Sequence, residues 1–175
     1  EYADVELALD GILDTVELTL PADLAKAPSV EIVDPEGTPV AEYGVAERRV
    51  TPLRPREHGL FQHLRRTPAE IREEYAGKKV AAVPVGAPLD TDALRRLGEI
   101  APAYDAVLLV ALIGPGSPKV VSPTGLLRVA LAAAEALPSQ VRVIPVPLAA
   151  RADEAADAAL RTRVAAAYGE PVEIV

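Results

Sequence analysis

The chain has 175 residues, a formal net charge of −8 and no cysteine, and half of its residues are hydrophobic. This length allows one ordinary domain or two small ones, the absence of cysteine excludes disulfides and thiolate metal sites, and the acidity argues against a nucleic-acid binder. No apolar run reaches the roughly 18 residues that could cross a bilayer, and two histidines cannot build a three-histidine zinc site, so we expect a cytoplasmic protein without a membrane segment or a metal.

The first third of the chain has the alternating pattern of short antiparallel strands. A turn sequence, Asp34-Pro35-Glu36-Gly37, separates two of the segments and predicts a hairpin between them. We therefore expect a small β domain that extends, with its linker, over residues 1–65. The predicted strands are Val16–Leu20, Val30–Val33, Val40–Val45 and Val50–Leu53.

A helix is predicted to begin directly after the linker. Thr67 has the character of an N-cap, Pro68 takes the first helical position, and Glu70 follows at the spacing of a capping box. The helix is expected to run to about Tyr75 and to stop at Gly77.

Strands and helices then alternate to the end of the chain, which predicts a parallel sheet covered on both faces. We therefore expect a Rossmann-like α/β domain over residues 66–175. Its predicted strands are Lys79–Val83, Asp105–Ile113, Val141–Val146 and Pro171–Val175, and its helices are Thr91–Ile100, Pro123–Leu137 and Ala152–Tyr168.

Three loops follow strands of this predicted sheet, where α/β proteins bind ligands. They are Pro84–Asp90, Gly114–Lys119 and Pro147–Arg151. The second loop, Gly-Pro-Gly-Ser-Pro-Lys, has the composition of a phosphate cradle with Lys119 as its charge, but it is not a P-loop, and a stiff loop without a ligand is the favoured interpretation.

Other candidate groups are few. Arg151 and Arg128 are further candidates for an anion, with a solvated or ion-paired role as the alternative. His58 and His63 lie in the linker, where a loop role is more common than catalysis.

Four collinear segments resemble the ATP sulfurylase (sulfate adenylyltransferase) family. Leu64–Arg72 is similar to the family's Leu-Arg-Leu-Thr-Pro-Ala-Glu-Leu-Arg, and the Asp34–Pro39 turn to its Arg-Asp-Pro-Glu-Gly hairpin. Val146–Arg151 resembles Leu-Pro-Leu-Ala-Met-Arg, and Arg163–Gly169 resembles Arg-Lys-Asn-Tyr-Gly. The resemblance implies an abbreviated PUA-like β domain followed by a nucleotidyltransferase-type domain of Rossmann-like fold, and it carries Arg151 over as a binding position.

The catalytic residues of that family are missing. Its Gln-Thr-Arg-Asn-Pro-x-His-x-x-His stretch should follow the first parallel strand, where only Pro88 matches. Side chains that donate nothing replace the family's Gln, Arg and Asn, so the charge of the phosphates would be left without donors. The replaced positions are Pro84 for Gln, Gly86 for Arg, Ala87 for Asn, and Asp90 and Ala93 for the two His.

Three functions remain open. The favoured one is a non-catalytic sulfurylase-like domain (a pseudoenzyme) of a sulfate-assimilation protein, of the kind fused to adenylylsulfate (APS) kinase. It would have an assembly or regulatory role, with that kinase domain or its own copy as partner. The start at Glu1 without Met indicates an excised segment. The alternatives are a nucleotide- or APS-binding enzyme that uses Lys119, Arg128 and Arg151, and a purely structural oligomerisation module; no cofactor is required, and ATP or APS is the expected kind of ligand.

Overall fold

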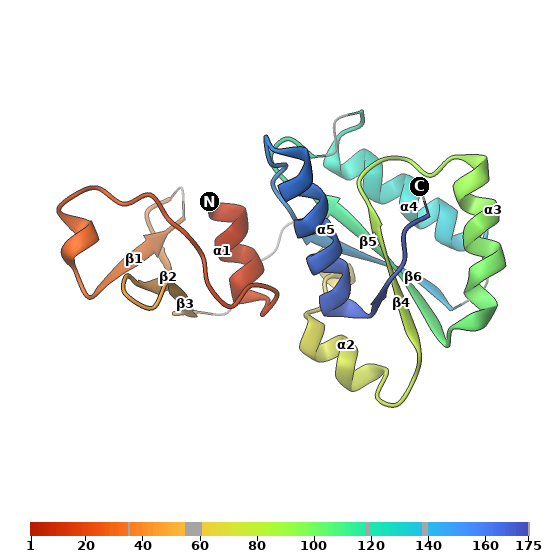
Figure 1. The fold of residues 1–175 in the computed structure, drawn as a ribbon, viewed down its shortest axis with the longest axis horizontal. Coiled ribbons are helices and arrows are strands. Elements are labelled where there is room, and N and C mark those ends of the chain that lie inside the picture. The colour runs from red at the N-terminus through yellow and green to blue at the C-terminus, as the bar shows by residue number, and fades with distance from the viewer. Residues whose placement is uncertain (35, 55–60, 118–119, 138–139, 175) are drawn as a thin grey trace. The chain divides into compact units, whose positions relative to one another are not determined.

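A computed structural model describes residues 1–34, 36–54, 61–117, 120–137 and 140–174. The chain divides into two compact units, Glu1–Gln62 and His63–Val175, and each is described by itself (Figure 1). The boundary expected after Arg65 and the family assignment of each half stay predictions.

The first unit combines one helix with a three-stranded antiparallel sheet in the order β1-β2-β3. The predicted hairpin is confirmed: Asp34 O accepts a bond from the N–H of Gly37, and Asp34 Oδ1 accepts one from the N–H of Thr38 at 2.7 Å. Gly37 has a φ of +83°, which favours glycine at this turn. The strands are β1 (Ser29–Val33), β2 (Pro39–Gly44) and β3 (Arg49–Pro52).

One expectation for this unit is wrong, and one of its elements was not expected. Tyr2–Leu9 forms a helix, α1, although the first third was expected to contain strands. Gly11 follows the C-cap residue Asp10, and its φ of +73° suits a left-handed position after the last turn. Val16–Leu20 is extended with Val16 buried, but it belongs to no sheet. Alternating burial therefore indicates only that one side of the segment is covered. It does not predict that the segment pairs with another strand in a sheet.

The second unit contains the expected parallel sheet, in the order β6-β5-β4-β7. Its centre, β5, is buried along almost its whole length. The four strands are β4 (Val80–Val85), β5 (Ala106–Ile113), β6 (Val141–Pro147) and a two-residue β7 (Glu170–Pro171).

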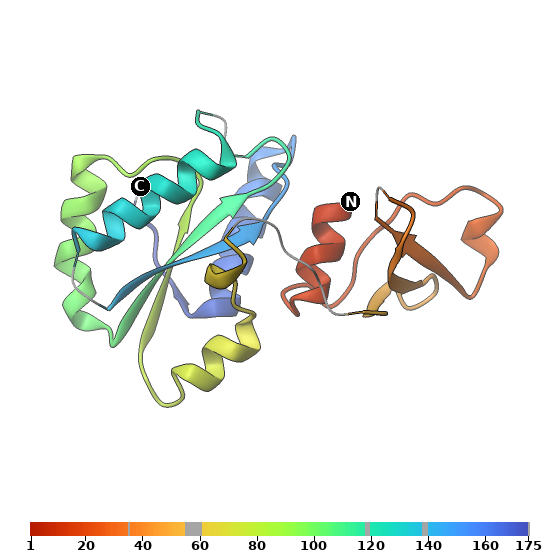
Figure 2. The ribbon, with the colours of Figure 1, turned by 180° about the vertical axis from the view of Figure 1, so that it is seen from behind.

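Helices cover both faces of this sheet. The four helices of the unit are α2 (Pro68–Glu74), α3 (Thr91–Ile100), α4 (Pro123–Glu135) and α5 (Glu154–Tyr168). Helix α4 packs on β5 and β6, and α5 packs mainly on β4 and against α2. The two opposite views show α4 and α5 on opposite faces (Figures 1 and 2). The strand order explains this arrangement. The connections from β4 to β5 and from β5 to β6 run one way across the sheet, and the connection from β6 to β7 runs the opposite way. Because such crossovers are right-handed, the helix of the reversed connection, α5, lies on the opposite face.

The capping box of α2 is confirmed. The Thr67 hydroxyl accepts a hydrogen bond from the N–H of Glu70, and the Glu70 carboxylate accepts one from the N–H of Thr67 at 2.6 Å. These bonds from the N–H and the hydroxyl of Thr67 hold the pKa of Glu70 below its usual value.

Proline residues mark the outer edge of β6. The N–H of Leu148 donates a hydrogen bond to Ile113 O. In a parallel pair, the N–H and C=O groups of alternate residues point toward the partner strand. In β6 the even-numbered residues therefore point these groups toward β5, and the odd-numbered residues point them away from the sheet. Pro145 and Pro147 take outward positions, where a missing N–H removes no ladder bond. The edge therefore offers few donors to an added strand.

The opposite edge of the sheet, formed by β7, also has an outward-facing proline. The N–H of Val172 bonds to Ala82 O, so the neighbouring Pro171 of β7 faces outward. Both edges of the sheet are thus unfavourable for pairing with a strand of another chain.

Candidate functional site

Two adjoining hollows lie at the carboxyl end of β4, where parallel sheets bind ligands. They have volumes of about 310 Å³ and 280 Å³ and share Pro84, Gly86, Ala87 and Ile174 as walls. All five positions at which the family motif is replaced line the second hollow, and three of them also line the first.

The guanidinium of Arg161, from α5, lies against Gly86. A Cβ built on Gly86 would come within 2.3 Å of Arg161 Nη1. Glycine therefore leaves the space that the arginine fills. The resemblance places an arginine of the family at position 86, so the structure brings a guanidinium to this place from a helix 75 residues further along the chain.

Asp157 holds Arg161 in this position. The carboxylate accepts a hydrogen bond from Arg161 Nε at 2.6 Å and another from the N–H of Arg151 at 2.8 Å. Both side chains of the ion pair are largely covered. Within the described part of the chain, Nη1 and Nη2 of Arg161 have no hydrogen bond, so these donors stay available.

Sequence reasoning missed Arg161. The pair Asp157 and Arg161 has the i, i+4 spacing of an ion pair on a helix, which is a common surface pattern. Only the tertiary packing of α5 over β4 shows that the guanidinium reaches the site. Arg96 of α3 was missed in the same way; it lines the second hollow, and its Nη1 donates to Ile174 O at 3.1 Å.

Asp90 and Ala93, which stand where the family has its two histidines, serve the start of α3. Asp90 is the N-cap, and its Oδ1 accepts a bond from the N–H of Ala93 at 2.8 Å. Ala93 is buried. Both positions therefore have a structural role in this chain.

The loop after β5 is closed by its own backbone. The N–H of Gly114 bonds to Ser117 O, and the N–H of Ser117 bonds to Gly114 O. Pro115 O accepts from the N–H of Ala150. A phosphate cradle needs amide N–H groups that point at the ligand, so these two amides cannot contribute to one, and Lys119 lies outside the described residues.

Of the other candidate residues, Arg151 is linked to Arg161 through Asp157, whose carboxylate accepts hydrogen bonds from the N–H of Arg151 and from Arg161 Nε. Arg128 is exposed on α4. Arg151 follows β6 and is half-buried, and its N–H is bonded to Asp157. His63 lies in a short 3-10 helix at the start of the unit, and His58 lies outside the described residues.

The charges that line the two hollows do not favour a highly charged anion. Arg161 lines the first hollow together with Glu173, and Arg96 lines the second together with Asp90 and Asp92. Because a triphosphate requires several unmatched cations around it, this edge is poorly suited to hold one. Among the described residues no cluster of three metal-ligating side chains occurs, and no helix is long and apolar enough to span a membrane.

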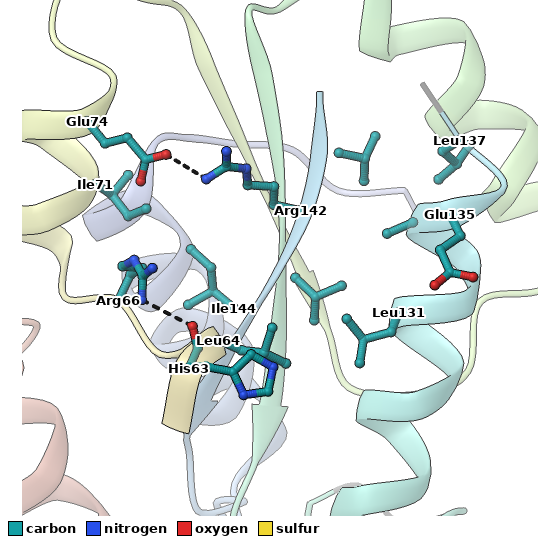
Figure 3. A pocket seen from close by; sticks show the side chains of 13 residues that line it. His63, Leu64, Arg66, Ile71, Glu74, Leu131, Glu135, Leu137, Arg142 and Ile144 are labelled. Carbon is teal, nitrogen blue, oxygen red and sulfur yellow. Dashed lines mark hydrogen bonds and ion pairs between the residues drawn. The ribbon is translucent and has the colours of Figure 1, made fainter. Parts of the chain in front are cut away.

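A further hollow of about 470 Å³ lies beside β6 at the start of the strand (Figure 3). Its walls are mainly aliphatic, from Leu64, Ile71, Leu131 and Ile144. Three of its charged groups are engaged: Arg142 Nη1 bonds to Glu74 at 2.5 Å, and Arg66 Nη1 donates to His63 O at 3.2 Å. It contains none of the ligand-binding candidates, and it lacks convergent free polar groups.

Comparison with known proteins gives one informative result. No family model matches the chain, and no curated protein matches it. Among solved structures, 13 chains match. One is the hexameric APS kinase from Thiobacillus denitrificans, with a TM-score of 0.67 and 20% identity over 86% of this chain. This chain spans 34% of that chain. At this identity the likeness shows the fold: a mixed α/β protein whose parallel four-stranded sheet is Rossmann-like.

Proposed function

We propose that this chain is a non-catalytic ATP sulfurylase-like part of a sulfate-activation protein, with a PUA-like first unit and an assembly or regulatory role. The observation that carries the proposal is the lack of suitable side chains at the carboxyl end of β4. Side-chain donors are absent from Pro84, Gly86 and Ala87, and Asp90 and Ala93 cap and fill a helix. Such an edge cannot surround ATP and sulfate with the charges that adenylyl transfer requires.

Contact between two of the resembling segments supports the family assignment. The hydroxyl of Tyr168, from Arg163–Gly169, donates to Arg66 O, from Leu64–Arg72, at 3.0 Å. The two segments are about 100 residues apart in the sequence. A shared fold would explain why both persist in a chain whose motif residues have changed.

The fold likeness to the APS kinase chain supports the same proposal. A kinase that binds ATP through a P-loop needs Gly-x-x-x-x-Gly-Lys-Ser/Thr, and this sequence contains no such motif. Because this chain spans only 34% of that chain, we propose that it corresponds to a part that does not hold the kinase P-loop. The match covers more than the second unit alone, so it also includes part of the first.

The decisive experiment is an assay of APS formation from ATP and sulfate with the purified chain. We expect no turnover above the rate without protein. Measurable turnover would overturn the proposal and favour the reworked enzyme. A pull-down with a separately expressed APS kinase domain tests the partner, and binding there is the expected result.

A second copy of this chain is the other candidate partner, because the similar APS kinase is hexameric. Outward prolines at both edges of the parallel sheet oppose strand addition. A homo-oligomer would therefore use helix or loop surfaces. Light scattering, with and without the kinase domain, separates the two partners.

A further inference from the structure

We propose that the hollow beside Gly86 binds one tetrahedral oxyanion, of the sulfate or phosphate kind, through the guanidinium of Arg161. This inference rests on the proposed function, since it gives a ligand to the altered site of a sulfurylase-like domain. It goes further because it names a residue outside the replaced motif and limits the ligand to a single anionic group.

The first support is the way Arg161 is held. Its Nε is bonded to Asp157 at 2.6 Å, and its Nη1 lies close over Gly86. Both terminal nitrogens are without a hydrogen bond in the described part of the chain, although the residue is only 30% exposed. A planar guanidinium with two donors of fixed direction matches two oxygens of a sulfate or phosphate.

The second support is the backbone next to this guanidinium. Gly86 and Ala87 follow the last residue of β4, and both line the hollow that Arg161 lines. Within the residues that the structure describes, neither N–H donates a hydrogen bond. Backbone N–H groups bind oxyanions through charge-assisted hydrogen bonds, so these two amides can add to what Arg161 provides.

The third support concerns size and charge, which limit the ligand. The hollow has a volume of about 310 Å³, and Glu173 is exposed on its rim. Among the described residues that line it, Arg161 is the one cation. Because Asp157 already pairs with Arg161, this wall has no net positive charge. The free Nη donors and the two backbone amides suit one small oxyanion, whereas a triphosphate would bring more negative charge than this wall can balance.

The test is a titration of the whole chain with sodium sulfate and, separately, inorganic phosphate, at an ionic strength kept constant with sodium chloride. We expect saturable shifts of the Gly86 and Ala87 amide resonances. Arg161→Gln should weaken binding about tenfold or more, the usual effect of losing hydrogen bonds to a charged group. Arg95→Gln is the matched control: Arg95 pairs with Asp92 and Glu99 on α3, outside this hollow, so binding should not change.

Two further variants keep the test independent of any folding defect. Glu173→Gln removes the rim carboxylate and should tighten binding about twofold or more. Gly86→Ala should weaken binding, because the new methyl group displaces Nη1. Failure of sulfate and phosphate to bind the wild-type chain, or equal binding by Arg161→Gln, overturns this inference. Neither result touches the proposed function, which fails on APS formation.

Discussion

The loops after β4 and β5 are both rich in glycine and proline, yet the structure uses their glycines in different ways. Gly114 lets two backbone segments meet: a Cβ there would come within 2.4 Å of Leu148 O. Gly86 makes room for the flexible end of the Arg161 side chain. The loop with the stronger resemblance to a phosphate cradle is closed on itself, and the plainer loop adjoins the available donors.

This difference teaches how to interpret a glycine near a strand end. A glycine that faces backbone is a packing requirement, because the neighbour cannot move without disturbing the sheet. One that faces a side-chain terminus indicates a place where a functional group has been brought close. Four variants would break or sharpen this comparison.

The largest effect is expected for Gly114→Ala. The added methyl group meets Leu148 O and the N–H of Ala149, and neither can shift alone. Overpacking of this kind costs about 3 kcal/mol at the upper end of its usual range. Urea unfolding followed by circular dichroism measures the loss. A variant as stable as the wild type would show that the two loops do not differ as we describe.

Asp157→Ala should have the next largest effect. It removes the acceptor of the Arg151 N–H and of Arg161 Nε. Hydrogen bonds that involve a charged group contribute about 1.5 to 3 kcal/mol each, and solvent will replace part of this loss at a half-buried site. We expect a loss of about 1 to 2 kcal/mol in urea unfolding, together with weaker sulfate binding. Unchanged sulfate binding would show that Asp157 does not position Arg161.

Thr67→Ala should have the third largest effect. It measures how much a local contact, the N-cap of α2, contributes to the free energy of unfolding, and Thr67 belongs to neither loop. Loss of an N-cap costs about 1 kcal/mol. Because the pKa of Glu70 is lowered in the folded state by Thr67, the Glu70 contribution is present at neutral pH and is lost as the pH falls below 4.5 through the folded-state pKa. The difference between variant and wild type should therefore shrink in acid, as measured by urea unfolding at pH 7 and pH 3. Because the backbone N–H at position 67 is kept in the variant, a constant difference would contradict the hydrogen bond from the Thr67 hydroxyl to the Glu70 carboxylate.

The smallest effect on stability is expected for Gly86→Ala. The clash is with the end of a long side chain, which can swing aside, so the free energy of unfolding should change by less than about 0.5 kcal/mol. The same variant should still weaken sulfate binding. A stability loss as large as that of Gly114→Ala would show that the two glycines have the same role.

Most of the second unit could be predicted from local patterns. The capping box at Thr67 and the continuous apolar run of β5 each carry their signal within a few residues. The first unit was harder: α1 was not expected, and its buried residues Ala3, Asp4, Val5 and Leu7 include an acidic side chain. Val16–Leu20 alternates, and it pairs with no strand.

The candidate site shows the same limit more sharply. The sequence indicated the correct edge of the sheet and the absence of side-chain donors from Pro84, Gly86 and Ala87. It offered Lys119, Arg128 and Arg151 as cations, and the structure brings none of the described two into the hollow lined by Arg161. A contact across 75 residues leaves no periodic signal that a single sequence could show.

By itself, the sequence determined the order of strands and helices in the α/β unit and the loss of motif side chains, because both are local properties of the chain. Only the tertiary structure decided which groups meet at the end of β4. Helix α5 crosses to the other face of the sheet and lies on β4, so the guanidinium of Arg161 reaches the space that Gly86 leaves. That space exists because glycine has no side chain, and packing alone determines which residue fills it.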